Sequence, residues 1–276
     1  MKNIAVLIRV YDRVNDLKYN IQIINDLWKQ NNYKIYVSFN GKSDGYKLDK
    51  SIYNYSEEVI ELDQNAGHLK GNSQLLLEGM EKIDLSNFEY LIILEADTWL
   101  MGDSLITKYI SKLDSSDNVW ASSEWVENRH SIGVDFAIID ANFISKHYKN
   151  MFTFKTMAEM WMAEYMMNIN TKYIFIKELM PVHRPSLIKS IYNADGGRLR
   201  VFPLGNMVTH HIENLSGRME KKKELADIVY GDNYFINCSK LKLNIFYFLY
   251  TLLNITLKFI PKSSWFKDKK RTFITS

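Results

Sequence analysis

The first hundred residues alternate between apolar runs of strand length and segments with apolar residues at helical spacing. Residues 4–10 form an apolar run, which is typical of a strand covered on both faces. Leu17, Ile21, Ile24 and Trp28 then recur at steps of 4, 3 and 4 residues, the spacing of an amphipathic helix. Further strands are expected at 33–39, 59–62 and 90–94, and a helix at 69–80. This alternation predicts an α/β fold: a doubly wound, mostly parallel sheet with helices on both faces.

The second half of the chain has shorter and less regular elements. Helices are expected from Asp103 or Ser104 to Leu113, at 156–167 and at 216–229, and short strands at 119–122, 132–139, 173–176 and 199–202. The methionine-rich stripe in the helix at 156–167 indicates core packing rather than a cofactor site. We expect one catalytic domain over residues 1–238, followed by a separate tail over residues 239–276.

Composition excludes several classes of protein. With 276 residues, 46% hydrophobic and 24% charged, and with only 4 prolines, the chain is neither disordered nor collagen-like. A single cysteine, Cys238, forms no internal disulfide and indicates a reducing compartment. The first apolar run is too short for a secretory signal. These features predict a cytoplasmic location.

The net charge is distributed unevenly. The whole chain carries +3, but the last 38 residues hold eight basic residues and one acid, a net of +7, which leaves −4 for the rest. A mildly acidic body argues against nucleic acid as a partner. The basic tail favours a local contact with an anionic membrane surface.

The tail also contains an amphipathic pattern. Residues 241–260 include 14 apolar or aromatic residues, and polar residues recur along one stripe at Asn244, Tyr247, Thr251, Asn254 and Lys258. A helix with such a stripe suits the membrane interface, where the stripe faces water or the catalytic domain. A spanning helix and a helix that completes the domain core remain alternatives. We therefore expect a C-terminal amphipathic helix and a peripheral position on the inner face of the cell membrane.

The strongest chemical signal is the triplet Glu95-Ala96-Asp97, which follows the apolar strand at 90–94. On an extended backbone the side chains of Glu95 and Asp97 project to the same side. Ligands of parallel sheets bind at the carboxyl ends of the strands. Two carboxylates at such an end suit Mg²⁺ or Mn²⁺, which can bridge the protein to a diphosphate. Taken alone, the triplet is also consistent with a turn cap and a solvated strand end.

A second candidate lies about 25 residues earlier. The segment from Asn65 to Asn72 marks a strand-to-helix transition and includes Gly67, Lys70 and Gly71. Glycines permit close backbone approach, and a helix N-terminus suits a phosphate or a polar sugar. The alternative is an ordinary helix start.

Together these motifs resemble the glycosyltransferase-A fold, and most closely the nucleotide-sugar glycosyltransferases of family 2. The resemblance spans residues 3–103 well and residues 130–215 loosely. It implies that Arg9, Tyr11, Asp12 and Asn40 hold the base and ribose of the donor. It also implies that the acid-x-acid motif binds ribose and metal, with Asp97 on the metal and Glu95 nearer the ribose.

The sequence departs from the family pattern at two points. Asn40-Gly41 replaces the usual aspartate pair after the second strand, with Asp44 only nearby, which leaves the nucleotide open although a UDP-sugar is favoured. Glu95 replaces an aspartate, which lengthens the side chain without removing its charge.

The resemblance also implies a general base near the start of a helix that follows the acid-x-acid strand. An inverting transferase needs a carboxylate to take the proton of the acceptor hydroxyl. Glu159 is the first candidate, Glu164 its competitor and Asp135 a third. Glu159 and Glu164 lie about 140° apart around a helix, so both cannot face the site equally. His210, or else His211, is a candidate ligand for the metal or the diphosphate.

These features predict a metal-dependent, inverting glycosyltransferase that takes Mn²⁺ or Mg²⁺ and transfers a hexose from a nucleotide-diphosphate donor. The acceptor would be a hydroxyl on a growing, lipid-linked surface glycan, as in lipopolysaccharide or capsule biosynthesis. Two alternatives stay open. A sugar-phosphate nucleotidyltransferase normally has a glycine-rich loop after the first strand, and residues 9–16 contain no glycine. The other alternative is a non-catalytic sugar- or nucleotide-binding subunit.

Overall fold

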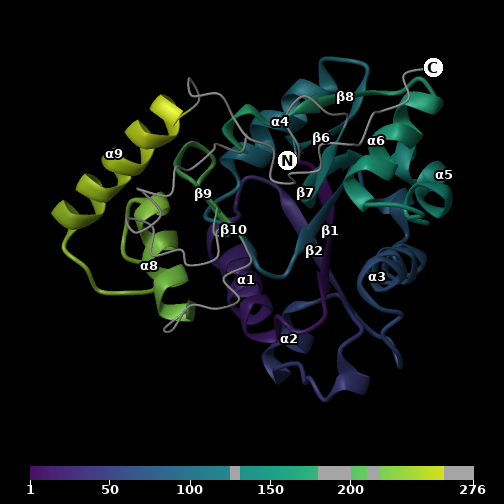
Figure 1. Cartoon of the computed structure of the whole chain (residues 1–276), viewed down its shortest axis with the longest axis horizontal. Helices are drawn as coiled ribbons and strands as arrows, with labels where there is room; N and C mark the ends of the chain where they lie inside the picture. The colour runs from purple at the N-terminus through teal and green to yellow at the C-terminus, as the bar shows by residue number, and fades with distance from the viewer. Residues whose placement is uncertain (125–130, 180–199, 210–217, 258–276) are drawn as a thin grey trace.

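The main sheet is mixed but mostly parallel, as predicted. The computed structural model describes residues 1–124, 131–179, 200–209 and 218–257. Seven strands lie in the order β3-β2-β1-β4-β7-β6-β8 (Figure 1). β7 is antiparallel to both of its neighbours, and the other paired strands are parallel. The strands are β1 (Asn3–Val10), β2 (Asn32–Phe39), β3 (Glu58–Glu61), β4 (Tyr90–Glu95), β6 (Asn118–Glu124), β7 (Ile132–Asp140) and β8 (Lys172–Phe175).

Helices cover both faces of this sheet, which confirms the second part of the prediction. One face packs against α1 (Val14–Leu27) and α4 (Ser104–Asp114), and the other against α3 (His68–Lys82), α5 (Ala141–Met151) and α6 (Ala158–Asn168). The packing of strand β1 shows why its sequence is apolar from Ile4 to Ile8. Ile4, Val6 and Ile8 pack on the α1 side, whereas Ala5 and Leu7 pack on the α3 side. A strand buried on both faces has no exposed side that would favour polar residues.

A small antiparallel sheet adjoins the main one and pairs a strand that follows β4 with two strands of the C-terminal half. It consists of β5 (Thr98–Leu100), β10 (Met207–Thr209) and β9 (Arg200–Phe202), and β10 and β9 both contact helix α8 (Arg218–Tyr230). Among the described elements, the sequence did not predict β5, α5 or the short helix α2 (Lys50–Tyr55). Four single-turn 3₁₀ helices complete these elements: η1 (Lys42–Asp44), η2 (Leu85–Asn87), η3 (Lys177–Leu179) and η5 (Pro203–Gly205).

The C-terminal helix α9 (Lys240–Leu257) packs on the body of the protein through one of its sides. Leu243 and Tyr250 are buried in the core cluster that also contains Trp99. Of the expected polar stripe, Tyr247 and Thr251 are half-buried whereas Asn244 is exposed, and Lys258 lies outside the described residues. Within the part of the chain that the structure describes, no helix has both the length and the apolar character needed to cross a membrane.

Candidate functional site

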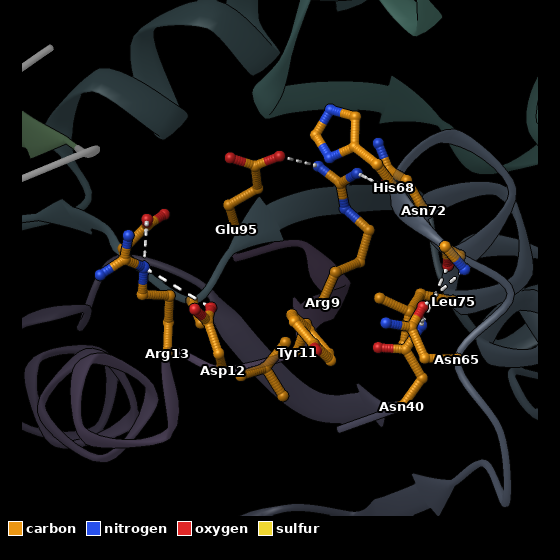
Figure 2. A pocket seen from close by; sticks show the side chains of 15 residues that line it. Arg9, Tyr11, Asp12, Arg13, Asn40, Asn65, His68, Asn72, Leu75 and Glu95 are labelled. Carbon is orange, nitrogen blue, oxygen red and sulfur yellow. Dashed lines mark hydrogen bonds and ion pairs between the residues drawn. The ribbon is translucent and has the colours of Figure 1, made fainter. Parts of the chain in front are cut away.

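A pocket of about 480 Å³ opens where β1, β2 and β4 end. The carboxyl ends of parallel strands are the usual ligand-binding edge of such a sheet. Figure 2 shows side chains from the ends of all three strands and from the start of α3 around this space. The lining residues are Arg9, Val10, Tyr11, Asp12, Arg13, Asn40, Asn65, Gly67, His68, Gly71, Asn72, Leu75, Glu95, Ala96 and Asp97.

The structure thus brings most of the predicted donor-binding residues together. The exception is Lys70, which is exposed on α3 and is not among the residues that line the pocket. His68 and Arg13, which the sequence did not single out, do line it.

Arg9 is the central cation of the pocket. Its side chain is buried, and Nη2 lies 3.3 Å from Oε1 of Glu95 and also donates to the backbone oxygen of Val134. Nη1 donates to Oδ1 of Asn72 (Figure 2). Nε is buried and has no hydrogen-bond partner among the described residues. The guanidinium is therefore fixed by strands β4 and β7 and helix α3.

Arg13 supplies a second cation, on the side of the pocket formed by Asp12 and Asp97. Its Nε lies 3.6 Å from Oδ1 of Asp12 and 3.8 Å from Oδ2 of Asp97. Both carboxylates and Arg13 line the pocket. The sequence does contain a signal for this residue, because Arg13 follows Arg9 by four residues and lies in the loop that leaves β1. A guanidinium between two carboxylates can turn towards a phosphate when a metal ion or an anion enters.

Glu95 and Asp97 do not both belong to a strand, which corrects the prediction from strand alternation. Strand β4 ends at Glu95, and residues 96–97 form a turn before β5. The amide of the buried Asn20 holds this turn: Nδ2 donates to the backbone oxygens of Glu95, Ala96 and Thr98 at 3.2, 3.1 and 2.9 Å. The two carboxylates face the same pocket because of this turn and not because of the period of two.

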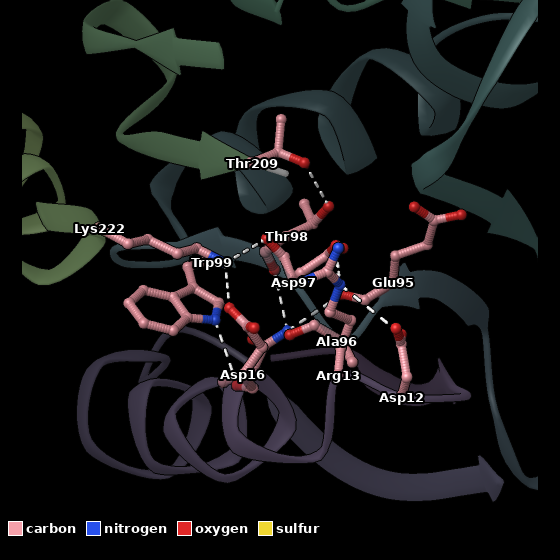
Figure 3. A network of polar contacts seen from close by, with 11 residues as sticks. Asp12, Arg13, Asp16, Glu95, Ala96, Asp97, Thr98, Trp99, Thr209 and Lys222 are labelled. Atoms are coloured by element: carbon pink, nitrogen blue, oxygen red, sulfur yellow. Dashed lines mark hydrogen bonds and ion pairs between the residues drawn. The ribbon is translucent and has the colours of Figure 1, made fainter. Parts of the chain in front are cut away.

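Helix α8 holds the same turn from the C-terminal half of the chain. Figure 3 shows Lys222 reaching from α8 to the start of β5. Its Nζ is 2.5 Å from Oδ1 of Asp16, 2.6 Å from the backbone oxygen of Asp97 and 4.0 Å from the centre of the Trp99 ring. Because Lys222 and Asp16 are both buried, each charge depends on the other. Lys222 is therefore a positioning residue for Asp97.

Two amide side chains form the wall of the pocket opposite Arg13. Nδ2 of Asn40 lies 3.3 Å from Oδ1 of Asn65 and 3.4 Å from the backbone oxygen of Gly71. Oδ1 of Asn40 is buried and has no hydrogen-bond partner within the described chain. A Cβ at Gly71 would lie 2.5 Å from Oδ1 of Asn65 and 3.1 Å from Nδ2 of Asn40, so a larger residue at this position would displace these amides.

The start of α3 presents backbone amides to the same wall. Gly67 precedes the helix with φ +88°, a left-handed conformation that favours glycine, and its N–H donates to Oδ1 of Asn65 at 3.0 Å. Gly67 and His68 line the pocket. A helix N-terminus carries partial positive charge, which suits a phosphate group beside it.

Tyr11 stands at the mouth of the pocket. Its ring meets that of Tyr46 edge to face at 5.4 Å, and a hydrogen bond to Asp44 raises the pKa of its hydroxyl. Close packing explains why Gly41 stands where the resemblance implies an aspartate. A Cβ at this position would overlap the backbone oxygen of Tyr11. The loops after β1 and β2 therefore pack too closely for an aspartate at position 41.

The candidate base Glu159 lies in the first turn of α6 and is buried. Burial raises its pKa to about 7; the negative charges of Glu95 and Asp135 add to the rise, and Arg9 opposes it. Glu159 thus lies close enough to Arg9, Glu95 and Asp135 to interact with them, although neither Glu159 nor Asp135 lines the pocket. Glu164 is exposed, so the structure separates the two competing glutamates as the helix geometry predicts.

The carboxylates form only a partial metal site. Among the described residues, no group of three or more His, Cys, Asp or Glu side chains could hold an ion. His210 lies outside the described residues. Mg²⁺ usually keeps several waters and takes one or two carboxylates together with substrate phosphates. Asp97 and Glu95 fit that pattern, provided that a diphosphate supplies the remaining oxygens.

No protein-family profile matches the chain, and no curated protein sequence matches it significantly. Solved structures show partial likenesses. A mannosyltransferase from Pyrobaculum calidifontis, solved with GDP-Man and Mn²⁺, has 8% identity and a TM-score of 0.48 over 64% of this chain and 55% of its own. TarS residues 1–349 from S. aureus have 11% identity and a TM-score of 0.42 over 60% of this chain and 56% of their own.

A third likeness is to 4-diphosphocytidyl-2C-methyl-D-erythritol synthase from Anaerococcus prevotii, with 11% identity and a TM-score of 0.41 over 63% of this chain and 87% of its own. The chain spans only about half the length of the mannosyltransferase and of the TarS fragment. At such identities and TM-scores the likenesses assign no residue and no activity to this chain. The mostly parallel sheet, covered by helices on both faces, agrees with the glycosyltransferase-A-like fold that the sequence predicted.

Proposed function

We propose that this chain is a metal-dependent glycosyltransferase that moves a hexose from a nucleotide-diphosphate donor to a hydroxyl group of a glycan, with inversion at the anomeric carbon. One observation carries the proposal. At the carboxyl edge of the sheet, groups suited to a diphosphate surround one pocket, and a buried carboxylate with a pKa of about 7 lies beside them.

The donor would lie across the pocket from the amide wall to the acidic turn. Tyr11 offers a ring face or edge to the base, and the amide side chains of Asn40 and Asn65 line the same part of the pocket. A UDP-sugar is the favoured donor. The ribose would approach Asp12 and Glu95. The diphosphate would then lie between Arg13 and the N-terminus of α3, both of which attract negative charge.

The acidic turn would hold the metal. Asp97, with Glu95, would bind Mn²⁺ or Mg²⁺ together with oxygens of the donor diphosphate. A bound ion would neutralise the charge that develops on the departing diphosphate. Arg13, which now pairs with Asp97, would turn from the carboxylate towards the phosphates when both arrive.

Glu159 would act as the base of an inverting step. The acceptor oxygen forms a bond to the anomeric carbon while the bond from that carbon to the diphosphate oxygen breaks. The proton of the acceptor hydroxyl passes to a carboxylate oxygen of Glu159, and the nucleoside diphosphate leaves with the bonding electrons. A base with a pKa near 7 matches proton transfer at neutral pH. Asp135 remains the second candidate for this role.

The acceptor class follows from the tail rather than from the pocket. A basic amphipathic helix places an enzyme near an anionic surface, which suits a lipid-linked glycan of the lipopolysaccharide or capsule type on the cytoplasmic face.

Calorimetric titration tests donor binding. UDP, GDP, CDP and TDP are titrated into the protein with Mn²⁺ and again with EDTA. We expect one of them, with UDP favoured, to bind in Mn²⁺ and to lose affinity in EDTA and in Asp97→Asn. The control variant Asp117→Asn removes an exposed carboxylate from another part of the chain and should bind as the wild type does. Absence of binding by all four nucleotides in Mn²⁺ would contradict the proposal.

A product assay separates the alternatives. A glycosyltransferase releases a nucleoside diphosphate from a nucleotide sugar. A nucleotidyltransferase instead releases pyrophosphate from a nucleoside triphosphate and a sugar phosphate. A binding subunit takes up the nucleotide and releases neither product.

A further inference from the structure

The side of α9 that faces away from the protein is apolar and exposed. Helices on protein surfaces normally expose polar residues, and large contiguous apolar patches mark sites that bind a partner or a membrane. Phe248 is 63% exposed and Leu241 71% exposed. The exposed large apolar residues of this helix, which we call the α9 apolar face, are Leu241, Ile245, Phe248, Leu249, Leu252 and Ile255.

This face is held in place by packing on the opposite side of the helix. Leu243 and Tyr250 are buried in the core cluster, and Phe246 and Leu253 pack against it. Figure 1 shows α9 at the edge of the molecule, beyond α8 and far from α5 and α6. The apolar face is therefore displayed by a helix that is anchored on the protein body, rather than by a detached segment.

Basic residues at the start of the helix and in the sequence that follows it suit an anionic partner. Lys240 and Lys242 are exposed at the start of the helix, where they pair with Asp232 and Glu224. The sequence beyond the helix adds six basic residues and one acid: Lys258, Lys262, Lys267, Lys269, Lys270, Arg271 and Asp268. Apolar residues that enter the headgroup region, with lysines beside them that reach lipid phosphates, are the two attractions that hold an interfacial helix.

We propose that the α9 apolar face is a membrane-binding surface, which inserts its aliphatic and aromatic side chains into the interface of an anionic bilayer. The occupant is a lipid surface and not a second copy of the chain. A dimer through this face would bring together two tails that each carry a net charge of +7, and like charges at close range oppose association. The proposal does not depend on the transferase activity, because it rests on α9 and on the basic residues of the tail.

The polar stripe predicted from the sequence lies partly towards the catalytic domain, one of the two orientations expected for it. Tyr247 and Thr251 are half-buried on the side of the body, whereas Asn244 is exposed and the aliphatic row lies outward. The helix would therefore lie flat, with the α9 apolar face towards the lipid and the side that carries Leu243 and Tyr250 packed on the protein. This orientation predicts which substitutions abolish membrane binding.

Vesicle sedimentation with the full chain tests the proposal. The probes are vesicles of phosphatidylcholine alone and of phosphatidylcholine with phosphatidylglycerol as a quarter of the lipid. We expect the wild type to sediment with the anionic vesicles and to do so less at high salt. The triple variant Ile245→Gln, Phe248→Gln and Leu252→Gln should bind about ten-fold or more weakly, since each change removes apolar surface from the lipid. The control, Tyr55→Gln with Met167→Gln, alters exposed apolar residues of α2 and α6 and should bind as the wild type does.

Several results would overturn the proposal. The wild-type protein would stay in solution with anionic vesicles, or the triple variant would bind as strongly as the wild type. The control variant would alternatively lose as much vesicle binding as the triple variant does. A wild-type dimer in sedimentation equilibrium without lipid, dissociated by the triple substitution, would assign the face to a second copy instead.

A second variant keeps the test valid even if the triple variant fails to fold. Phe248→Trp places an indole on the exposed face of a folded helix. Its fluorescence, taken as a difference from wild type, should shift to shorter wavelength and be quenched by brominated lipid when anionic vesicles are added. An unchanged difference spectrum would contradict insertion of this face.

Discussion

The glutamate beside the pocket gives the most quantitative test, because its role as a base and its cost to stability depend on the same buried carboxylate. Burial raises the pKa of Glu159 from its usual 4.5 to about 7, and the carboxylates of Glu95 and Asp135 contribute. In the unfolded chain the carboxyl ionises near its usual value. The folded protein therefore loses stability as the pH rises from about 4.5 to about 7, since ionisation is less favourable in the folded state.

The magnitude follows from the two pKa values. One pH unit between folded and unfolded values corresponds to about 1.4 kcal/mol, so the full loss is about 3 kcal/mol. Glu159→Gln keeps the size and most of the hydrogen bonding of the side chain but cannot ionise. We therefore expect the unfolding free energy of the variant, relative to the wild type, to rise by about 3 kcal/mol between roughly pH 4.5 and pH 8.

Urea unfolding across this range measures the difference, and transfer assays measure the cost to function. The same substitution should lower the transfer rate by about 10²-fold or more and leave donor binding largely intact. Glu164→Gln on the exposed side of α6 is the matched control and should change neither quantity. A stability difference that stays flat with pH would refute a buried, neutral Glu159. Near-normal transfer by Glu159→Gln, together with an inactive Asp135→Asn, would move the base to Asp135.

Three further predictions concern the acidic turn and its neighbours. Asp97→Asn should abolish transfer with the fold intact, and EDTA should do the same to the wild type; full activity in either case would remove the metal from the mechanism. Lys222→Met leaves the buried Asp16 unpaired and should lower the unfolding free energy by about 3–5 kcal/mol. Adding Asp16→Asn should restore part of that free energy. Purely additive losses in the double-mutant cycle would show that the two residues are not coupled. Gly71→Ala should weaken nucleotide binding about ten-fold or more because the new Cβ displaces the side chain of Asn65, while the circular dichroism spectrum stays unchanged. Unaltered affinity would exclude the amide side chains of Asn40 and Asn65 from the donor site.

The parallel core could be predicted because a strand that is buried on both faces has apolar residues at consecutive positions. Residues 4–8 of β1 show this pattern. In α1 the apolar residues recur at steps of 3 and 4, which is the spacing of a helix and not of a strand. β5 could not be predicted in the same way: it has three residues, too few for a period to appear. The helix α5 was missed because few of its residues are buried: only Ala141, Ile144 and Met151 of this helix are.

Part of the candidate site could be predicted because the order of strands along the chain implies where their carboxyl ends lie. Asn65 and Glu95 were found because each follows or ends a strand, where chain order implies position. Lys222 was not found, since it approaches the turn from a helix that begins more than a hundred residues later and lies in a run of lysines typical of a solvated surface. Only the fold shows that this particular lysine is buried against Asp16.

Release of nucleoside diphosphate tests the central claim most directly. The wild-type protein is incubated with Mn²⁺, a panel of nucleotide sugars and a lipid-linked glycan fraction, and the nucleotide products are separated and quantified. We expect a nucleoside diphosphate to appear from one donor, with UDP favoured, and to disappear in Asp97→Asn and Glu159→Gln but not in Asp117→Asn. Failure to release any nucleoside diphosphate, or equal release by all of these variants, would contradict a glycosyltransferase site at this edge of the sheet.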